Sequence, residues 1–421
     1  MVKNTKQYLV KININTLVYL ALACYYLLGI FGETTLSDIA IVSTISGILN
    51  VVVILALIWK IVIQKYSASS LLRIAIFFAV FFLAYYLCEY KELYRIFLFV
   101  TAAKGIDMKK VAKQTIILTL AAILLVMLLT EIGFIEAVWI SGGTSRTFFW
   151  TASSSTQIYL WGFTHHNFIG CRIMMCYTCY VFLRYEKYKI WDFLVGIVAF
   201  VFCYQVIKSR TTAFLIIITM ILIIIFKLLQ YFGDKKNKPL MKIGTYAIMI
   251  IAPVLSIVVS IKYTASNILY FLLDQIIYTR FSYANSIFKE YGLSLFGQNV
   301  ELISTVEANE SGVSAIVLDN AYMHLLIRCG LCVTVLVLLA WFLVARTALN
   351  EKKYSVAIIV AVYFICGISE KWLFTITYNP FVLFWSICLY SQNLALFDIN
   401  SDEKKRKRIR FKINNHKFDP S

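Results

Sequence analysis

Residues 211–230 read TTAFLIIITMILIIIFKLLQ, an apolar run in which Lys227 is the only charged residue. A helix of this length rises about 30 Å, which matches the hydrocarbon thickness of a bilayer. The run lacks the alternation of apolar and polar residues expected of a barrel strand, so its backbone must satisfy its own hydrogen bonds as a helix. We therefore predict that residues 211–230 cross a membrane.

Apolar runs of similar character lie on both sides of this one. They cover residues 8–30, 37–59, 71–88, 93–103, 114–131, 166–183, 190–207, 243–261, 321–345, 354–369 and 373–395. With 211–230, they predict an all-α integral membrane protein with about twelve transmembrane helices in a single polytopic domain, 1–421. The run 93–103 is too short to cross alone, so we expect it to recruit residues 91–95 or to enter as a partial helix.

The composition agrees with a membrane protein. Hydrophobic residues make up 61% of the chain, charged residues 15%, and the mean hydropathy is +0.78. A soluble domain carries about 25% charged residues. The low charged fraction and the high hydropathy therefore exclude a soluble domain. The ten cysteines lie in or at the ends of apolar runs. Cys176 and Cys179 form a C-x-x-C inside one run, which fits either metal or redox use or simple packing of small side chains.

The basic residues predict the orientation. With the N-terminus inside, 29 of the 40 Lys and Arg fall in cytoplasmic segments, which places both termini in the cytoplasm. Two long outer loops follow, 132–165 and 262–320, and the second has apolar, aromatic stretches at 267–278 and 281–291 that are typical of interfacial helices. The basic tail 396–421 is expected to anchor on anionic lipid. Orientation explains the net charge of +18 better than nucleic-acid binding does.

Arg210 marks the outer start of the 211–230 helix, where the helix dipole disfavours a cation. Free backbone N–H groups, the hydroxyls of Ser209, Thr211 and Thr212, and a guanidinium together form a typical site for phosphate or pyrophosphate. The alternative is an arginine that reaches the membrane interface with its charged end.

The segment 162–167, GFTHHN, opens the sixth run. His165 and Arg172 share a helical face, and Arg172 is either an anion contact in a cavity or half of a structural ion pair. His165 and His166 are candidate bases or hydrogen-bond donors, or with Asn167 they cap the helix. No further His or carboxylate at ligand spacing indicates a metal site.

The segment 318–330, LDNAYMHLLIRCG, carries a polar stripe into an apolar helix, because Asn320, His324 and Arg328 recur at intervals of four. Asp319 immediately precedes this stripe and either caps the helix or accepts a proton from a sugar hydroxyl. Three further charged residues face outward: Arg146, Arg280 and Glu370.

At these residues the chain resembles the Wzy-type O-antigen and capsule polysaccharide polymerases and, more distantly, the O-antigen ligases. The resemblance rests on four blocks in matching order: GFTHHN at 162–167, Ser209-Arg210-Thr211, the segment 319–330, and Ser369-Glu370 followed by Asn379-Pro380. His166 occupies the usual proline position. Asp319 stands where ligases commonly carry a catalytic histidine, so a ligase-type base does not transfer.

The resemblance implies a GT-C-like lipid-to-sugar glycosyltransferase. It would transfer a growing glycan from undecaprenyl pyrophosphate to another lipid-linked repeat unit outside the cytoplasmic membrane, without metal or cofactor, with a flippase and a chain-length regulator as partner proteins. Expected roles are catalysis by Asp319 or His165 and pyrophosphate binding by Arg210, Arg172 and Arg280. Expected substrate contacts are Arg146, His166, Asn167, Asn320, Tyr322, His324, Arg328 and Glu370.

Three other functions remain open at this point. A ligase would share every block and differ in its acceptor. A flippase for lipid-linked oligosaccharides would predict charges through a central cavity and a repeat-related architecture, whereas no internal repeat is evident. A non-catalytic scaffold would tolerate the loss of Arg210 and Asp319.

Overall fold

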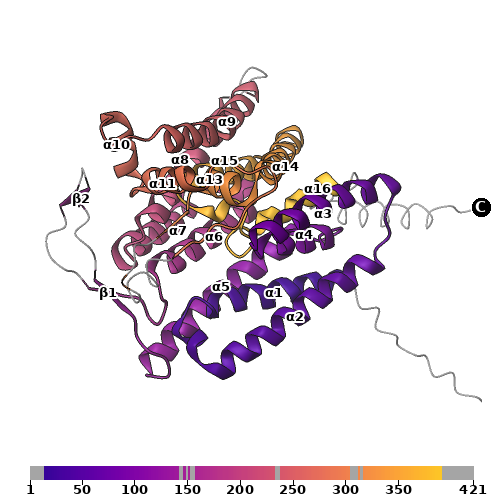
Figure 1. Ribbon diagram of the computed structural model, residues 1–421, viewed down its shortest axis with the longest axis horizontal. Coiled ribbons are helices and arrows are strands. Elements are labelled where there is room, and N and C mark those ends of the chain that lie inside the picture. Colours follow the sequence, from indigo (N-terminus) through magenta and orange to yellow (C-terminus); the bar gives the residue numbers. More distant parts are fainter. Residues whose placement is uncertain are drawn as a thin grey trace, which may run out of the picture.

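The computed structural model describes residues 14–141, 146–147, 150–151, 157–232, 238–303, 312 and 316–390, with the backbone alone at 140–151 and at 238 (Figure 1). In the first half of the chain the elements are α1 (Asn15–Phe31), η1 (Thr35–Asp38), α2 (Ala40–Ile63), α3 (Ala68–Cys88), α4 (Glu92–Ala102), α5 (Met108–Glu131), β1 (Trp139–Ser141), β2 (Arg146–Thr147), β3 (Trp150–Thr151), β4 (Gln157–Tyr159), α6 (His166–Arg184) and η2 (Tyr185–Lys187).

The second half begins with α7 (Asp192–Val201), η3 (Phe202–Val206), α8 (Arg210–Tyr231), α9 (Lys238–Lys262), α10 (Ile268–Ile276) and α11 (Arg280–Tyr291). It continues with α13 (Ala321–Met323), η4 (His324–Cys329), α14 (Leu331–Asn350), α15 (Tyr354–Cys366), η5 (Lys371–Leu373), η6 (Pro380–Trp385) and α16 (Ser386–Leu389). The strands of the first loop make two short antiparallel pairs, β1 with β4 and β2 with β3.

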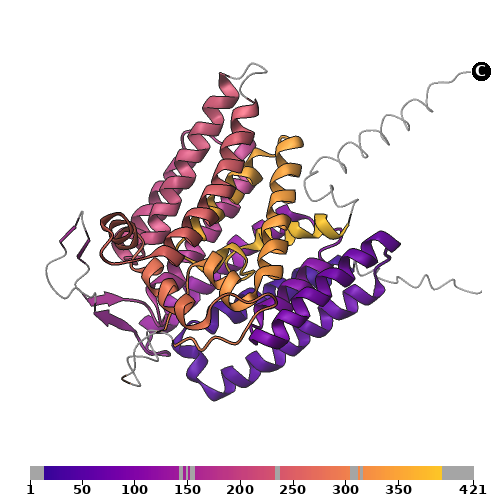
Figure 2. The same ribbon diagram turned by 45° about the horizontal axis from the view of Figure 1, so that its top comes forward.

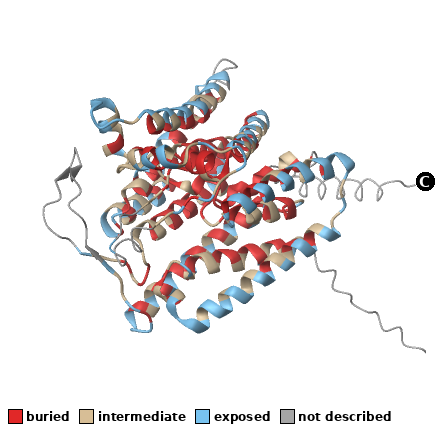
Figure 3. Cartoon of the chain, in the orientation of Figure 1, coloured by how far each residue is buried: buried red, intermediate tan, exposed pale blue. Residues whose placement is uncertain are grey.

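The structure confirms a mostly helical, membrane-embedded protein. Six of the described helices are long and apolar enough to cross a bilayer, namely α2, α3, α5, α8, α9 and α14. Figure 3 shows exposed as well as buried residues along these helices. On α2, for example, Ile41, Ile48 and Leu55 are exposed. An apolar surface of this extent needs lipid around it. Shorter helices occupy the other runs, and the total of twelve crossings stays a prediction.

Two predicted runs are not single helices. The run 373–395 is broken, because Asn379 caps a new turn at Pro380 and the described chain continues as η6 and α16. The run 321–345 divides at Gly330, which has a φ of +91°. A Cβ there would lie 2.3 Å from the Gly297 nitrogen, so only glycine allows the loop around Gly297 to approach the helix break.

Helix α15 is the axis of the bundle. Nearly all its side chains are buried, and it contacts α6, α8, α9 and α14 (Figure 3). Figure 2 shows α8, α9 and α14 running alongside one another, whereas α1, α2 and α5 pack together in the other part of the molecule. The centre is therefore occupied by packed side chains from both parts of the chain.

One end of the bundle gathers the ends of α1, α9 and α15 and the beginnings of α6 and α8. Backbone hydrogen bonds join these connections, from Thr35 N to Gly162 O at 2.9 Å, Thr164 N to Glu33 O at 3.0 Å, and Ala321 N to Gly367 O at 2.9 Å. Helices α10 and α11 lie at the same end, where the interfacial helices were predicted. The distribution of Lys and Arg predicts that this end faces outward.

Candidate functional site

Arg280, Asp319 and Glu370 form a charged cluster from three separate segments. Arg280 begins α11, and its Nη1 lies 2.7 Å from Asp319 Oδ2 while its Nη2 lies 3.7 Å from Glu370 Oε1. The side chains of Arg280 and Asp319 remain about one fifth exposed, and that of Glu370 is buried. Three candidate site residues from distant parts of the sequence, Arg280, Asp319 and Glu370, therefore lie together.

The two carboxyl groups of the cluster differ in environment. Burial raises the pKa of Glu370 to about 8, with the Asp319 charge adding to the rise and the charges of Arg280 and Lys371 opposing it. Among the described residues, Glu370 Oε1 accepts no hydrogen bond. At neutral pH the Glu370 carboxyl thus mostly holds its proton, while Asp319 makes the close pair with Arg280.

Asp319 does not cap the following helix, so the capping interpretation is wrong. The cap is Asn320, whose Oδ1 accepts hydrogen bonds from Tyr322 N at 3.1 Å and Met323 N at 3.2 Å. Its Nδ2 donates to Ser256 Oγ at 2.6 Å. Tyr322 is buried and donates to Phe364 O at 2.6 Å. Asn320 and Tyr322 therefore hold the segment in place, which leaves the Asp319 carboxylate directed to Arg280.

His165 and His166 border the same cluster. Their rings stack at 4.3 Å, the charges of Asp319 and Arg280 act on His165, and those of Arg280 and Arg210 act on His166. Burial is the main cause that lowers the pKa of His165, so its ring is neutral at pH 7. Its Nδ1 accepts the Asn167 N–H at 3.1 Å, which caps α6 and leaves the proton on Nε2. In this tautomer the free nitrogen of His165 donates a hydrogen bond and does not accept a proton.

Arg210 starts α8 as predicted. Its Nη1 donates to Tyr278 Oη at 3.0 Å, and its guanidinium carbon lies 5.8 Å from the centre of that ring. Next to it, Ser209 Oγ donates to Asn167 Oδ1 at 2.9 Å. Asn167 thus ties the start of α6 to the start of α8 and places Arg210 near His166.

Gly170 permits this close approach of α6 and α8. A Cβ at position 170 would lie 2.5 Å from Ser209 Oγ and 2.7 Å from Thr212 Oγ1, distances that real Cβ atoms do not adopt. The position of Arg210 relative to the histidines depends on this contact.

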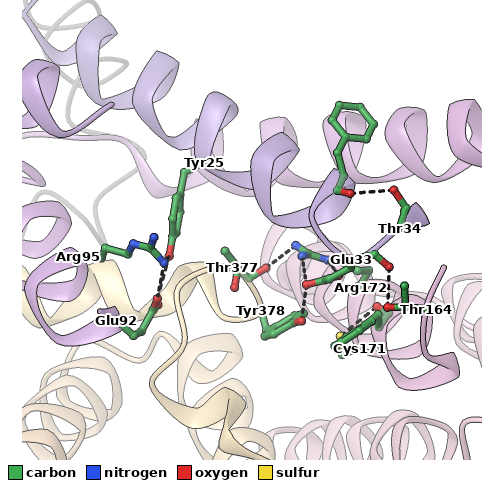
Figure 4. Close-up of polar contacts among 12 residues, drawn as sticks. Tyr25, Glu33, Thr34, Glu92, Arg95, Thr164, Cys171, Arg172, Thr377 and Tyr378 are labelled. Carbon is green, nitrogen blue, oxygen red and sulfur yellow. Dashed lines mark hydrogen bonds and ion pairs between the residues drawn. The ribbon is translucent and has the colours of Figure 1, made fainter. Parts of the chain in front are cut away.

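Arg172 contacts Glu33 and not the charged cluster of Arg280, Asp319 and Glu370 (Figure 4). It is fully buried, its Nη2 and Nε bind the Glu33 carboxylate at 2.7 and 3.3 Å, and its Nη1 donates to Thr377 O at 2.8 Å. Tyr378 donates its hydroxyl hydrogen to the same carboxylate, and its ring lies 4.7 Å from the guanidinium carbon. These contacts favour the structural ion pair over an anion contact.

The remaining predicted residues lie apart from the cluster. His324 and Arg328 pack against Tyr90, at 4.8 and 5.0 Å. Arg146 lies in β2, and its side chain is outside the described part of the chain. Within the described residues, no group of three His, Cys, Asp or Glu side chains could hold a metal ion.

Three residues with a role in this region were not predicted. Glu33 is the partner of Arg172, and Tyr278 is the partner of Arg210. Buried Glu92 accepts a hydrogen bond from Tyr25 Oη (Figure 4) and another from Ile376 N, both at 2.8 Å. An acid at the end of an apolar run was the available signal for Glu33 and Glu92. No family model, curated protein or solved structure matches this chain.

Proposed function

We propose that this chain is a glycosyltransferase that polymerises a bacterial surface polysaccharide at the outer face of the cytoplasmic membrane. It transfers a growing glycan from undecaprenyl pyrophosphate to a hydroxyl of another lipid-linked repeat unit. The observation that carries the proposal is the convergence of Arg210, Arg280, Asp319 and Glu370, from four segments, at one end of the bundle.

The two arginines suit the leaving group. When the anomeric carbon–oxygen bond breaks, its electron pair goes to the pyrophosphate, and Arg210 and Arg280 stabilise the charge that develops there. In the resting site Arg280 is paired with Asp319. A bound pyrophosphate competes for that guanidinium, so its arrival releases the Asp319 carboxylate for chemistry.

Asp319 is the base in this proposal. As the acceptor hydroxyl oxygen attacks the anomeric carbon, its proton passes to the Asp319 carboxylate. His165 and His166 flank the site, with the Nε2–H of His165 as a hydrogen-bond donor to substrate oxygen. Glu370, protonated at neutral pH, supplies a second donor for the departing pyrophosphate.

The test is incubation of purified protein with lipid-linked repeat units, followed by measurement of chain length. We expect polymer from the wild type and from Lys289→Gln, an exposed position on α11. Arg210→Lys should lose most activity, because an ammonium group cannot replace the planar fork on a pyrophosphate. Polymer formed at the wild-type rate by Arg210→Lys, or none by the wild type, contradicts the proposal. Product attached to an unrelated acceptor alone would indicate a ligase.

A further inference from the structure

A second group of basic side chains surrounds Tyr90, in the connection between α3 and α4. The Tyr90 ring lies edge-on to His324 at 4.8 Å and under the Arg328 guanidinium at 5.0 Å. Lys371 is close enough for its charge to act on both His324 and Glu92. We call His324, Arg328 and Lys371 the Tyr90 cluster.

Two buried polar atoms of the Tyr90 cluster have no hydrogen-bond partner among the described residues, although His324 Nδ1 lies 3.2 Å from Leu318 O. Within the described residues, His324 Nε2 and Arg328 Nε are buried without a hydrogen bond, and Lys371 Nζ makes no ion pair. Among the described residues, Glu92 forms its ion pair with Arg95, at 3.9 Å, and not with a member of the cluster, and its two oxygens accept from Tyr25 Oη and Ile376 N. Buried polar atoms normally have a hydrogen-bond partner, so these two atoms indicate a ligand. The neighbouring cations Arg328 and Lys371 favour an anionic one.

The Tyr90 cluster and the charged cluster of Arg280, Asp319 and Glu370 lie on opposite sides of the segment that carries Glu370 and Lys371. Glu370 has extended backbone angles, φ −140° and ψ 143°, and successive side chains of extended backbone point to opposite faces. Glu370 accordingly faces Arg280, and Lys371 faces His324.

The backbone that carries Arg328 is held firmly. η4 is a π-helix, a form that is rare and frequent at functional sites. Gln298 binds its last carbonyls, with N donating to Arg328 O at 3.0 Å and Nε2 to Ile327 O at 3.1 Å. The contact between Gly297 and Gly330 fixes the same turn.

An apolar groove lies between the two helices that Tyr90 connects. The two helices that Tyr90 connects enclose about 330 Å³, lined by Phe78, Phe82, Tyr85, Tyr94, Phe97 and Leu98. Phe78 and Phe82 are also exposed on the surface that faces lipid. A groove with apolar walls and cations at the adjoining connection matches a lipid with an anionic head and a long chain.

We propose that Arg328 and Lys371 bind the pyrophosphate of a second polyprenyl-linked substrate, whose chain lies in the groove between α3 and α4. This inference rests on the proposed function, in which donor and acceptor each carry a lipid pyrophosphate. Arg210 and Arg280 take the one whose bond breaks, because they lie beside Asp319. Arg328 and Lys371 take the one that stays attached to the acceptor.

The experiment measures binding of radiolabelled undecaprenyl pyrophosphate, without sugar, to purified protein in phosphatidylcholine nanodiscs. We expect two equivalents for the wild type and for the control Lys289→Gln. Arg328→Gln and Lys371→Gln should each weaken one equivalent by about tenfold or more, as expected from the loss of a charge-assisted contact. The Lys371 side chain makes no hydrogen bond or ion pair with the described residues, so its replacement tests the site without removing a contact seen in the fold.

The outcomes separate the two proposals. A wild type that makes polymer but binds one equivalent, or a Lys371→Gln variant that binds both equivalents normally, overturns the second site and leaves the polymerase function standing. A wild type that binds neither equivalent and makes no polymer overturns both. If excess phosphatidylglycerol displaces the second equivalent as readily as unlabelled undecaprenyl pyrophosphate does, the site takes anionic lipid in general, and its assignment to a substrate is wrong.

Discussion

Replacement of Glu370 by glutamine should change how the stability of the protein depends on pH. The pKa of this carboxyl rises from 4.5 to about 8 in the fold, mainly because the group is buried. At about 1.36 kcal/mol per unit, the rise corresponds to about 5 kcal/mol. Between those pH values the folded state binds the proton more strongly than the unfolded chain does, so the free energy of unfolding falls as the pH increases. The contribution is complete below pH 4.5 and is lost above about pH 8.

Glutamine keeps the shape and the donor of the protonated carboxyl but cannot ionise. The measurement is thermal unfolding of wild type, Glu370→Gln and Glu290→Gln in one detergent, from pH 4.5 to 9. Glu290 is exposed in the last turn of α11, away from Arg280, and serves as the control. We expect the melting temperature of the wild type to fall relative to Glu370→Gln as the pH rises. Parallel curves for the two proteins across the whole range would refute the assignment of a protonated Glu370.

Three further predictions concern the ion pair, the base and the topology. Glu33→Gln should destabilise the protein by about 3–5 kcal/mol, measured by unfolding in detergent, because it leaves Arg172 buried without its counter-charge; an unchanged stability would contradict this account. Asp319→Asn should fold normally, since the cap is its neighbour, yet lose about 10²–10⁴-fold in polymerisation rate, and full activity would exclude Asp319 as the base. In a variant whose accessible cysteines are replaced, Ser266→Cys should react with an impermeant thiol reagent on whole cells and Glu186→Cys should not; labelling at 186 would reverse the predicted orientation.

The membrane helices could be predicted because each depends on a local property, the length and polarity of one run. The interruption at Gly330 could not be predicted, because it depends on a distant contact. Gly330 looks like an ordinary helix residue in the sequence, and its role follows from the approach of Gly297, 33 positions earlier. The break at Asn379 and Pro380 has a local signal, because a capping residue followed by proline is typical of a helix start. From the sequence, we used these two residues only as part of the resemblance.

The sequence predicted which residues belong to the candidate site better than it predicted which of them contact one another. Arg210, Arg280, Asp319 and Glu370 stand out because charges beside apolar runs are costly. Which of them meet depends on how the helices pack.

Two choices that the sequence left open have clear physical reasons. Arg172 finds its partner Glu33 139 positions away, and no spacing rule links the two. Asp319 and Asn320 are equally good caps, so the choice between them depends on a helix start that the sequence locates only to within a few residues.

The contact at Gly170 constrains how this site can vary. Since even a methyl group would push α8 away from α6, the span between Arg210 and the histidines is set by a position that carries no functional group. The distance between α6 and α8 at this contact therefore cannot change by small steps through substitution of Gly170. A change in the size of the sugar unit would have to be accommodated by the connections around Tyr278 and Asp319, where the chain is partly exposed. Selectivity and chemistry would then be altered by different parts of the molecule.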